Sequence, residues 1–275
     1  MKGNSLTHLS LFTGIGGLDL AAESAGFETV GQCEWADYPT KVLKKHWPDV
    51  PRWRDIRTLT KESFYERTGL RTVDCLSGGA CQPHSIAGKR KASRDERDLW
   101  PKMRRVIGEI EPEWVVAENV RGLLSSEAGR FFRGILRDFS ELGYSVGWCV
   151  IRASDAGAVH RRERVAIVAH ADRKPVYGIR SYDGEEVLRQ KNGCPPEWNA
   201  LFRVSQQSGD FGRRLYFWND EPVKPLITRA DDGFSCAMDR NRCLGNAVVP
   251  AQFYPVFRAI AELALYCEER CADEL

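Results

Sequence analysis

The sequence has no long apolar run. Nowhere in its 275 residues does a hydrophobic stretch approach the ~20 residues that a membrane-spanning helix needs. The beginning, Met1 to Ser5, also lacks the hydrophobic segment of a secretory signal peptide. These absences remove the usual sequence signals of membrane insertion and export, and we expect a cytoplasmic protein.

Metal-ligand spacing is also absent. The nine cysteines form an odd set without a CxxC pair, which argues against a disulfide framework and against a zinc site. We therefore expect reduced thiols, most of them small core residues and at most one or two with a chemical role. No metal is predicted.

A strong overall charge is lacking too, because the formal net charge is only +2. The local distribution is more informative, since residues 86–105 hold eight basic side chains against three acidic ones. Such a patch suits a phosphate backbone. A solvated helix face and loop would explain the segment equally well.

The apolar pattern that is present predicts an α/β fold. The first 170 residues alternate short β-rich runs with amphipathic stretches, as in a doubly wound, mostly parallel sheet with helices on both faces. The predicted strands are Leu6–Phe12, Glu28–Glu34, Val73–Ser77, Trp114–Glu118, Tyr144–Ile151 and Val165–Ala169. The predicted helices are Leu18–Ala25, Tyr38–His46, a stretch around Lys102–Ile110, and Pro250–Tyr266.

Composition also predicts three parts. Residues 1–171 carry the alternating pattern and form the main domain. Residues 172–240 are rich in Gly, Pro, Asn and Gln without a clear period, which indicates a small irregular domain. Residues 241–275 regain a helical pattern, and we expect this C-terminal segment to pack back on the main domain.

A glycine-rich turn follows the first predicted strand. Phe12, Gly14, Gly16 and Gly17 stand between this strand and the first helix, where glycines allow close approach of the backbone to a ligand. Taken alone, the turn fits a plain tight turn or an NAD-binding loop as well.

Two further segments sharpen this interpretation. Glu34 ends the second strand, where a carboxylate can meet the two hydroxyls of an adenosine ribose, and Trp35 can stack on adenine. Asp55, followed by Ile56, can accept a hydrogen bond from the adenine amino group. The alternatives are a solvated strand end for Glu34, a core aromatic for Trp35 and a helix cap for Asp55.

In this order, the glycine turn, the Glu-Trp pair and the Asp-Ile pair resemble the cytosine-5 DNA methyltransferase family. The resemblance implies that these residues bind S-adenosyl-L-methionine on a Rossmann-like methyltransferase sheet. It also implies that residues 172–240 are a small target-recognition domain that reads double-stranded DNA in the major groove.

The segment from Leu76 to Ser85 resembles the nucleophile loop of the same family, with Cys81 as the nucleophile. The chemistry needs a thiolate, because its addition to C6 of cytosine makes C5 nucleophilic enough to accept a methyl group. One departure is that Ala80 replaces the family's proline, one residue closer to the glycine pair. A catalytically impaired DNA-binding relative therefore stays an alternative.

Two other segments carry candidate catalytic residues. Glu118 lies in Glu-Asn-Val, which resembles the family motif whose carboxyl group holds N3 and the amino group of the target base. Arg162 and Arg164 resemble the family's Gln-x-Arg-x-Arg motif, with His160 in place of glutamine. Two arginines at this spacing on an extended segment point the same way. A turn and a solvated edge strand are the alternatives.

Two weaker resemblances complete the cofactor site. Leu244 to Pro250, with Asn246 and Ala247, resembles the last motif of the family, which closes the cofactor pocket. Arg97 to Trp100 resembles a motif in which Leu99 and Trp100 line the methionine end of that pocket.

Several readings of the function stay open. The sequence also fits an RNA (tRNA) cytosine-5 methyltransferase, whereas an NAD-dependent oxidoreductase would leave the Cys81, Glu118 and arginine segments unexplained. We expect a monomer that flips its target base out of the duplex, without membrane contact. A cognate restriction endonuclease is a candidate partner.

Overall fold

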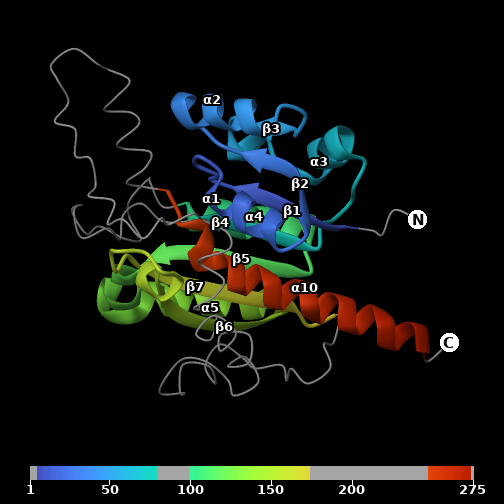
Figure 1. Ribbon diagram of the computed structural model, residues 1–275. Coiled ribbons are helices and arrows are strands. Elements are labelled where there is room, and N and C mark those ends of the chain that lie inside the picture. Colours follow the sequence, from blue (N-terminus) through green and yellow to red (C-terminus); the bar gives the residue numbers. More distant parts are fainter. Residues whose placement is uncertain (1–4, 80–98, 174–246, 274–275) are drawn as a thin grey trace, which may run out of the picture.

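The fold is built around one mixed sheet (Figure 1). The computed structural model describes residues 5–79, 99–173 and 247–273. Within these ranges seven strands pair in the order β3-β2-β1-β4-β5-β7-β6. The strands are β1 (Leu6–Leu11), β2 (Phe27–Cys33), β3 (Arg52–Trp53), β4 (Cys75–Gly79), β5 (Trp114–Val120), β6 (Tyr144–Arg152) and β7 (Glu163–Ala171).

Strand direction confirms the expected mostly parallel sheet. Strands β1 to β5 pair in parallel, and β7 runs antiparallel to both of its neighbours, β5 and β6. The carboxyl ends of β1, β2, β4 and β5 therefore meet at one edge, where ligands bind in open α/β sheets.

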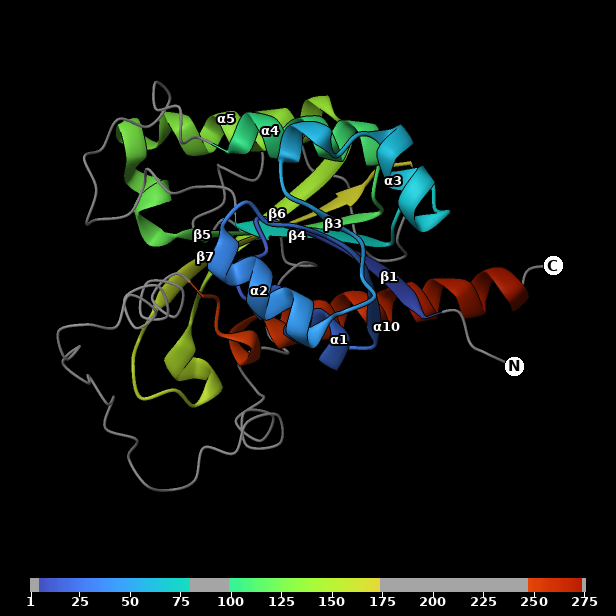
Figure 2. The ribbon, with the colours of Figure 1, turned by 90° about the horizontal axis from the view of Figure 1, so that it is seen from above.

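Helices cover both faces of this sheet, as Figure 2 shows. Helices α3, α4 and α5 lie on one face, and α1 and α10 lie on the other, which confirms the doubly wound α/β class. The helices are α1 (Gly17–Ser24), α2 (Asp37–His46), α3 (Lys61–Thr68), α4 (Trp100–Ile110), α5 (Arg130–Glu141) and α10 (Pro250–Asp273). Short 3-10 turns are η1 (Ile56–Thr58), η2 (Arg121–Gly129) and η3 (Ala153–Ala156).

The central strands are apolar on both faces because each face is covered. Along β5, Val115 and Ala117 belong to the core under α4 and α5, whereas Trp114 and Val116 belong to the core under α1 and α10. This two-sided burial explains why β5 and β7 read as continuous apolar runs rather than as an alternating pattern.

The sequence pattern missed or shifted several elements. Strand β4 starts at Cys75, two residues after the predicted start at Val73, and it runs on to Gly79. Elements β3, α3 and α5 were not predicted. Helix α3 begins with a capping box, in which Thr60 and Ser63 bond each other's backbone N–H. Gly69, with a left-handed φ of 73°, caps its C-terminal end.

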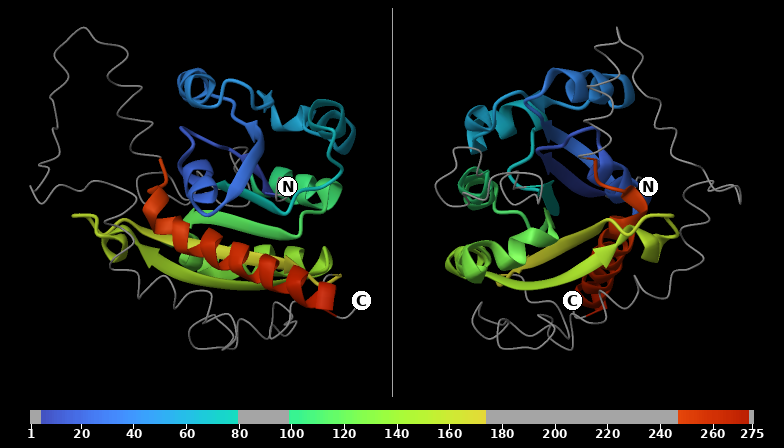
Figure 3. Two further views of the ribbon diagram at one scale, coloured as in Figure 1. Left: turned by 45° about the vertical axis from the view of Figure 1, so that its right-hand side comes forward. Right: turned by 90° about the vertical axis from the view of Figure 1, so that its left-hand side faces the viewer.

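The C-terminal helix crosses one face of the sheet (Figure 3). Helix α10 begins at Pro250, as predicted, and continues past Tyr266 to Asp273. Its buried side chains Phe253, Phe257 and Ile260 share a core with α1. Among the helices of the described ranges, none combines the length and apolarity needed to cross a membrane. The predicted division into residues 172–240 and 241–275 stays a prediction, because residues 174–246 lie outside those ranges.

Candidate active site

The glycine turn has a backbone that few side chains would permit. Phe12, directly after β1, has a φ of 52°, and Gly14 and Gly16 have φ values of 59° and 89°. A positive φ is uncommon for a residue such as Phe12 and marks local strain. A Cβ atom on Gly16 would stand 2.5 Å from the ring of Trp47. Close packing of the Trp47 ring against Gly16 therefore shapes the turn.

Glu34 at the end of β2 is joined to this turn. Its Oε2 accepts the N–H of Gly14 at 2.7 Å, and its Oε1 accepts the N–H of Ala36 at 2.8 Å. Burial raises the pKa of Glu34, and these backbone donors oppose that rise. A carboxylate has about four acceptor positions, so two remain for the two hydroxyls of a ribose. Trp35 beside it is 69% exposed, so it is not a core aromatic.

Asp55 acts as a cap in this structure, which was its alternative reading. Its Oδ1 accepts the N–H of Arg57 at 2.9 Å, so that it starts η1, and the Arg57 guanidinium bonds both carboxylate oxygens. These hydrogen bonds lower the pKa of Asp55 to about 2. Ile56 is buried, and its carbonyl accepts from Arg105 of α4 at 2.6 Å.

A buried polar network that no sequence motif indicates lies near the glycine turn. Asp19 of α1 accepts from Ser10 of β1 at 2.9 Å and from Gln32 of β2 at 2.8 Å. Gln32 in turn accepts from Arg52 of β3 at 2.8 Å. Burial raises the pKa of Asp19 to about 6. Acidic residues are common in the first turn of a helix, where they interact with the helix dipole. The position of Asp19 in the sequence therefore did not indicate this network.

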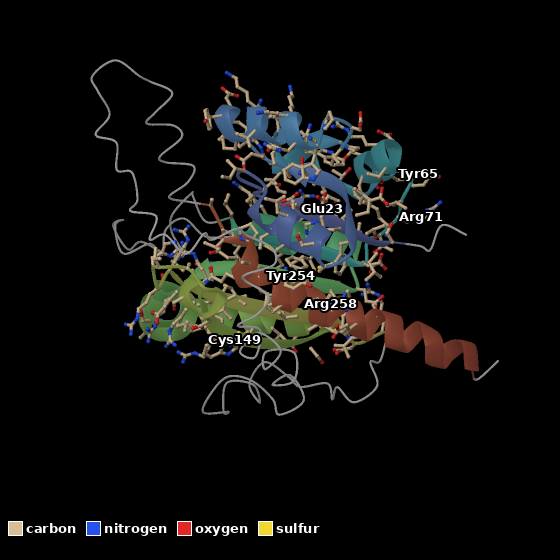
Figure 4. The ribbon with its side chains drawn as sticks, in the orientation of Figure 1. Glu23, Tyr65, Arg71, Cys149, Tyr254 and Arg258 are labelled. Atoms are coloured by element: carbon tan, nitrogen blue, oxygen red, sulfur yellow. The ribbon has the colours of Figure 1, made fainter. Side chains whose placement is uncertain are left out.

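Trp47 is a second supporting residue that the sequence did not indicate. Besides covering Gly16, it donates from Nε1 to Glu23 of α1 at 2.5 Å. Glu23 is labelled on that helix in Figure 4. The carbonyl of Trp47 accepts from the Arg52 guanidinium. The turn is thus held by α2 as well as by α1.

The chain before α10 closes over the same turn. A Cβ atom on Gly17 would stand 2.5 Å from the carbonyl oxygen of Val248, so this glycine is required for close contact with the C-terminal segment. Ala247 precedes Val248 and accepts a hydrogen bond from Arg162. The predicted Asn246 lies outside the described residues.

Leu99 and Trp100 differ in their surroundings. Leu99 is the N-cap of α4 and is partly buried. Trp100 is buried between α4 and α5, where its ring contacts Phe139 and its Nε1 donates to Asp138 at 2.6 Å. Trp100 therefore has a core role, and a contact of Leu99 with the cofactor stays a prediction.

Glu118 and Arg164 form a largely buried ion pair at the end of β5. Arg164 Nε lies 2.6 Å from Glu118 Oε1, and the two side chains are only 14% and 13% exposed. Burial raises the pKa of Glu118, while the charges of Arg164 and Arg162 lower it. The pair presents a carboxyl group that can take up or hold a proton beside two fixed cations.

Arg162 departs from the predicted extended segment. It precedes β7 with a φ of 34°, a left-handed conformation that an arginine rarely adopts. Its guanidinium still acts on Glu118, as does that of Arg164. Arg164 therefore contacts the predicted acid, whereas Arg162 lies in a turn two residues before Arg164, donates to the Ala247 carbonyl, and acts on Glu118 through its charge.

The end of β4 lies beside this acid. Gly79 and Glu118 are register partners on β4 and β5. A Cβ atom on Gly79 would stand 3.1 Å from Glu118 Oε2. Cys81, with Ala80, follows Gly79 and lies outside the described residues, as does the basic stretch before Leu99.

Two broader features of the site bear on partners. The described end of the basic segment is paired within the fold, since Arg104 contacts Asp138 and Glu141 and Arg105 contacts Glu109. These arginines of α4 therefore form ion pairs within the fold.

Over the ranges the structure covers, no three His, Cys, Asp or Glu side chains gather to hold a metal ion.

Together these features define a class of protein. A glycine turn after β1, an acid after β2 and a sheet with a topological switch between β1 and β4 are the nucleotide-binding edge of a Rossmann-like α/β fold. The model of the C-5 cytosine-specific DNA methylase family matches residues 6–197. The chain belongs to this family.

Known relatives agree with the assignment. Type II methyltransferase M.BsuFI of Bacillus subtilis is 34% identical over 230 residues, 82% of this chain and 53% of that protein. M.NgoBI of Neisseria gonorrhoeae is 33% identical over 242 residues, 84% of this chain and 73% of that protein. The chain thus spans about half the length of M.BsuFI and a larger share of M.NgoBI.

Solved structures show the same fold. A protein described as a prophage-encoded DNA modification methyltransferase of E. coli has a TM-score of 0.54 and 25% identity, over 62% of this chain and 47% of that one. Spodoptera frugiperda DNMT2 has a TM-score of 0.52 and 20% identity, over 65% and 54%. At that identity the second likeness concerns the fold alone.

Proposed function

We propose that the protein transfers a methyl group from S-adenosyl-L-methionine to C5 of a cytosine flipped out of double-stranded DNA. The observation that carries the proposal is the pairing of Gly79 with Glu118. Chain connectivity keeps the Cα of Cys81 within about 7 Å of the Cα of Gly79. This spacing supports a proposed site that combines the Cys81 thiol with Glu118.

The residues at the sheet edge suit the methyl donor. Glu34 has acceptor capacity for two ribose hydroxyls, Trp35 offers an exposed indole for adenine, and Gly17 lets the segment at Val248 close over the turn. Bound S-adenosyl-L-methionine would supply an electrophilic methyl carbon. Asp55 would bind the adenine amino group in place of one of the hydrogen bonds that Arg57 now donates to it.

On the base side, the thiolate of Cys81 adds to C6 of the cytosine and forms a carbon–sulfur bond. Glu118, whose pKa is raised by burial, holds the proton at N3 and accepts from the exocyclic amine. Arg164 keeps that carboxyl group in place and, with Arg162, can donate to O2. The C5 carbon made nucleophilic in this way would bond to the methyl group of the donor, and S-adenosyl-L-homocysteine would leave. A base, water in our proposal, then removes the C5 proton, and the carbon–sulfur bond breaks to release Cys81.

The experiment is methyl transfer from labelled donor to matched DNA and RNA substrates. We expect label in DNA with the wild type and none with Cys81→Ala. The matched control is Cys149→Ala, a cysteine on the edge strand β6 (Figure 4), which should transfer normally. Label in RNA alone would favour the RNA methyltransferase reading. No transfer by the wild type would favour an impaired relative, for which Ala80 is the feature to restore to proline.

The partners are part of the same proposal. Residues 172–240 would read the target sequence, and a cognate restriction endonuclease would cut the unmethylated site. The Type II names of the relatives support this restriction-modification setting.

A further inference from the structure

The first turn of α10 and the start of β7 hold each other through reciprocal hydrogen bonds. The side-chain amide of Gln252 donates from Nε2 to the carbonyls of Ile151 and Arg162, each at 2.9 Å. In the other direction, the Arg162 guanidinium donates to the carbonyl of Ala247. Ala247 and Gln252 flank the start of α10, so the contacts form a closed ring.

The backbone carbonyl of Arg162 needs a hydrogen-bond donor from outside the sheet, because Arg162 lies just before β7 begins. The paired register of β6 and β7 ends at Arg152 and Glu163, and Arg162 stands one residue beyond it with a φ of 34°. Its carbonyl therefore has no strand partner in the ladder, and a part-buried carbonyl without a hydrogen bond costs free energy. Gln252, only 3% exposed, supplies that partner.

The ring lies next to the base-binding acid. Arg164 contacts Glu118 directly at 2.6 Å, and Arg162 stands two residues earlier in the chain, where its positive charge also acts on Glu118. The position of Arg162, by contrast, depends on a strained backbone and on the contacts with α10. A change at α10 therefore reaches Glu118 through Arg162.

We infer that Gln252 is a positioning residue for methyl transfer: by binding the Arg162 carbonyl it fixes where the Arg162 guanidinium lies relative to Glu118. In the proposed mechanism Gln252 itself touches neither the methyl donor nor the base. The inference rests on the proposed function. It differs from a simple anchoring of α10, which would act equally whatever side chain stands at position 162.

A double-mutant cycle separates these two roles. Gln252→Met keeps the length and helix propensity of the side chain but removes both donors. In the otherwise wild-type protein, which retains Arg162, we expect Gln252→Met to lower the single-turnover rate of methyl transfer about tenfold, because small misplacements of catalytic groups are costly. In the Arg162→Ala background the same change should lower the rate less than about twofold. The dissociation constant of the donor should stay within about threefold.

The control is Arg258→Gln on the same helix, an exposed residue paired with Glu262 (Figure 4), which should leave both quantities unchanged. Equal rate losses in both backgrounds, or a donor affinity that falls in step with the rate, would overturn the inference. Gln252→Asn, which is one methylene shorter and retains the amide, repeats the cycle if the methionine variant does not fold. A wild type that transfers no methyl group would refute the proposed function itself, a separate result.

Discussion

At the scale of single residues, Glu118 carries the sharpest chemical demand. It is nearly buried, beside two arginines, and its pKa is raised by burial and lowered by those charges. The balance suits a group that alternates between accepting and holding a proton.

Glu118→Gln should therefore slow methyl transfer by about 10²-fold, since an amide cannot exchange the proton at N3. Donor binding should stay unchanged, because the donor site lies at β1 and β2. Single-turnover transfer and calorimetric donor binding measure the two effects. Glu262→Gln, an exposed position on α10, is the matched control. A variant that retains more than half of the rate would remove Glu118 from the chemistry.

Trp35 is proposed for a different task, because its indole is 69% exposed and is open to stacking against the adenine of the donor. Trp35→Ala should weaken donor binding about tenfold through loss of stacking while leaving the melting temperature unchanged. Tyr65→Ala, a half-exposed aromatic on α3 (Figure 4), should alter neither. Unchanged donor affinity in the Trp35 variant would contradict the stacking role.

At the scale of elements, helix α1 and the segment before α10 approach each other through Gly17. A methyl group there would overlap the Val248 carbonyl. Gly17→Ala should lower the free energy of unfolding by about 1–3 kcal/mol, as overpacking does, and should weaken donor binding as well. Urea unfolding and calorimetry measure both quantities.

The matched control for that change is Gly134→Ala in α5, where a Cβ atom meets nothing within 4 Å. Alanine there should stabilise the helix by roughly 0.5–1 kcal/mol. If both alanine variants were equally stable and bound the donor equally well, the close contact between Gly17 and Val248 would be wrong.

The strands and helices that could be predicted are those whose pattern lies within a short stretch of sequence. The apolar runs of β1, β2, β5 and β7 and the start of α10 at Pro250 were found from the sequence because both-face burial and helix caps are written locally. Strand β3 was missed because two residues form no period. Helix α5 was overlooked although Phe132, Ile135, Leu136 and Phe139 follow helical spacing.

The site divides in the same way. The acid, the glycines and both arginines were predicted from motif resemblance, and the structure joins Glu34 to the turn and Arg164 to Glu118. The left-handed turn at Arg162, the Asp19 network and the Gln252 contacts could not be predicted. They depend on residues far apart in sequence whose contacts only the fold creates.

At the scale of the whole molecule, the buried charge of Asp19 links stability to pH. Its pKa is raised from 3.8 to about 6, so the native state takes up a proton that the unfolded chain releases. The aspartate therefore costs stability above pH 6, and the cost disappears as the pH falls toward 4. His8 acts in the opposite direction. Because burial lowers its pKa to about 3, His8 lowers the stability of the fold as the pH falls below the pKa of a free histidine.

Asp19→Asn should accordingly have a higher free energy of unfolding than the wild type at pH 7.5. The gain should be up to roughly 3 kcal/mol, because a rise in pKa from 3.8 to about 6 corresponds to about 1.36 kcal/mol for each pKa unit. The difference should shrink as the pH is lowered through 6 toward 4. His8 is common to both proteins and cancels in the comparison. Denaturant unfolding at several pH values provides the test, and a difference that does not depend on pH would show that Asp19 is not the buried titrating group.

The most direct measurement concerns the thiol itself. A duplex with 5-fluorocytosine at the target position cannot lose a proton from C5, so the enzyme should remain bonded to C6 after methyl transfer. Mass spectrometry of the digested complex should then place the nucleotide on Cys81, in the wild type and in Cys149→Ala alike. Full methyl transfer to normal DNA without any such adduct, or an adduct on another cysteine, would contradict the account.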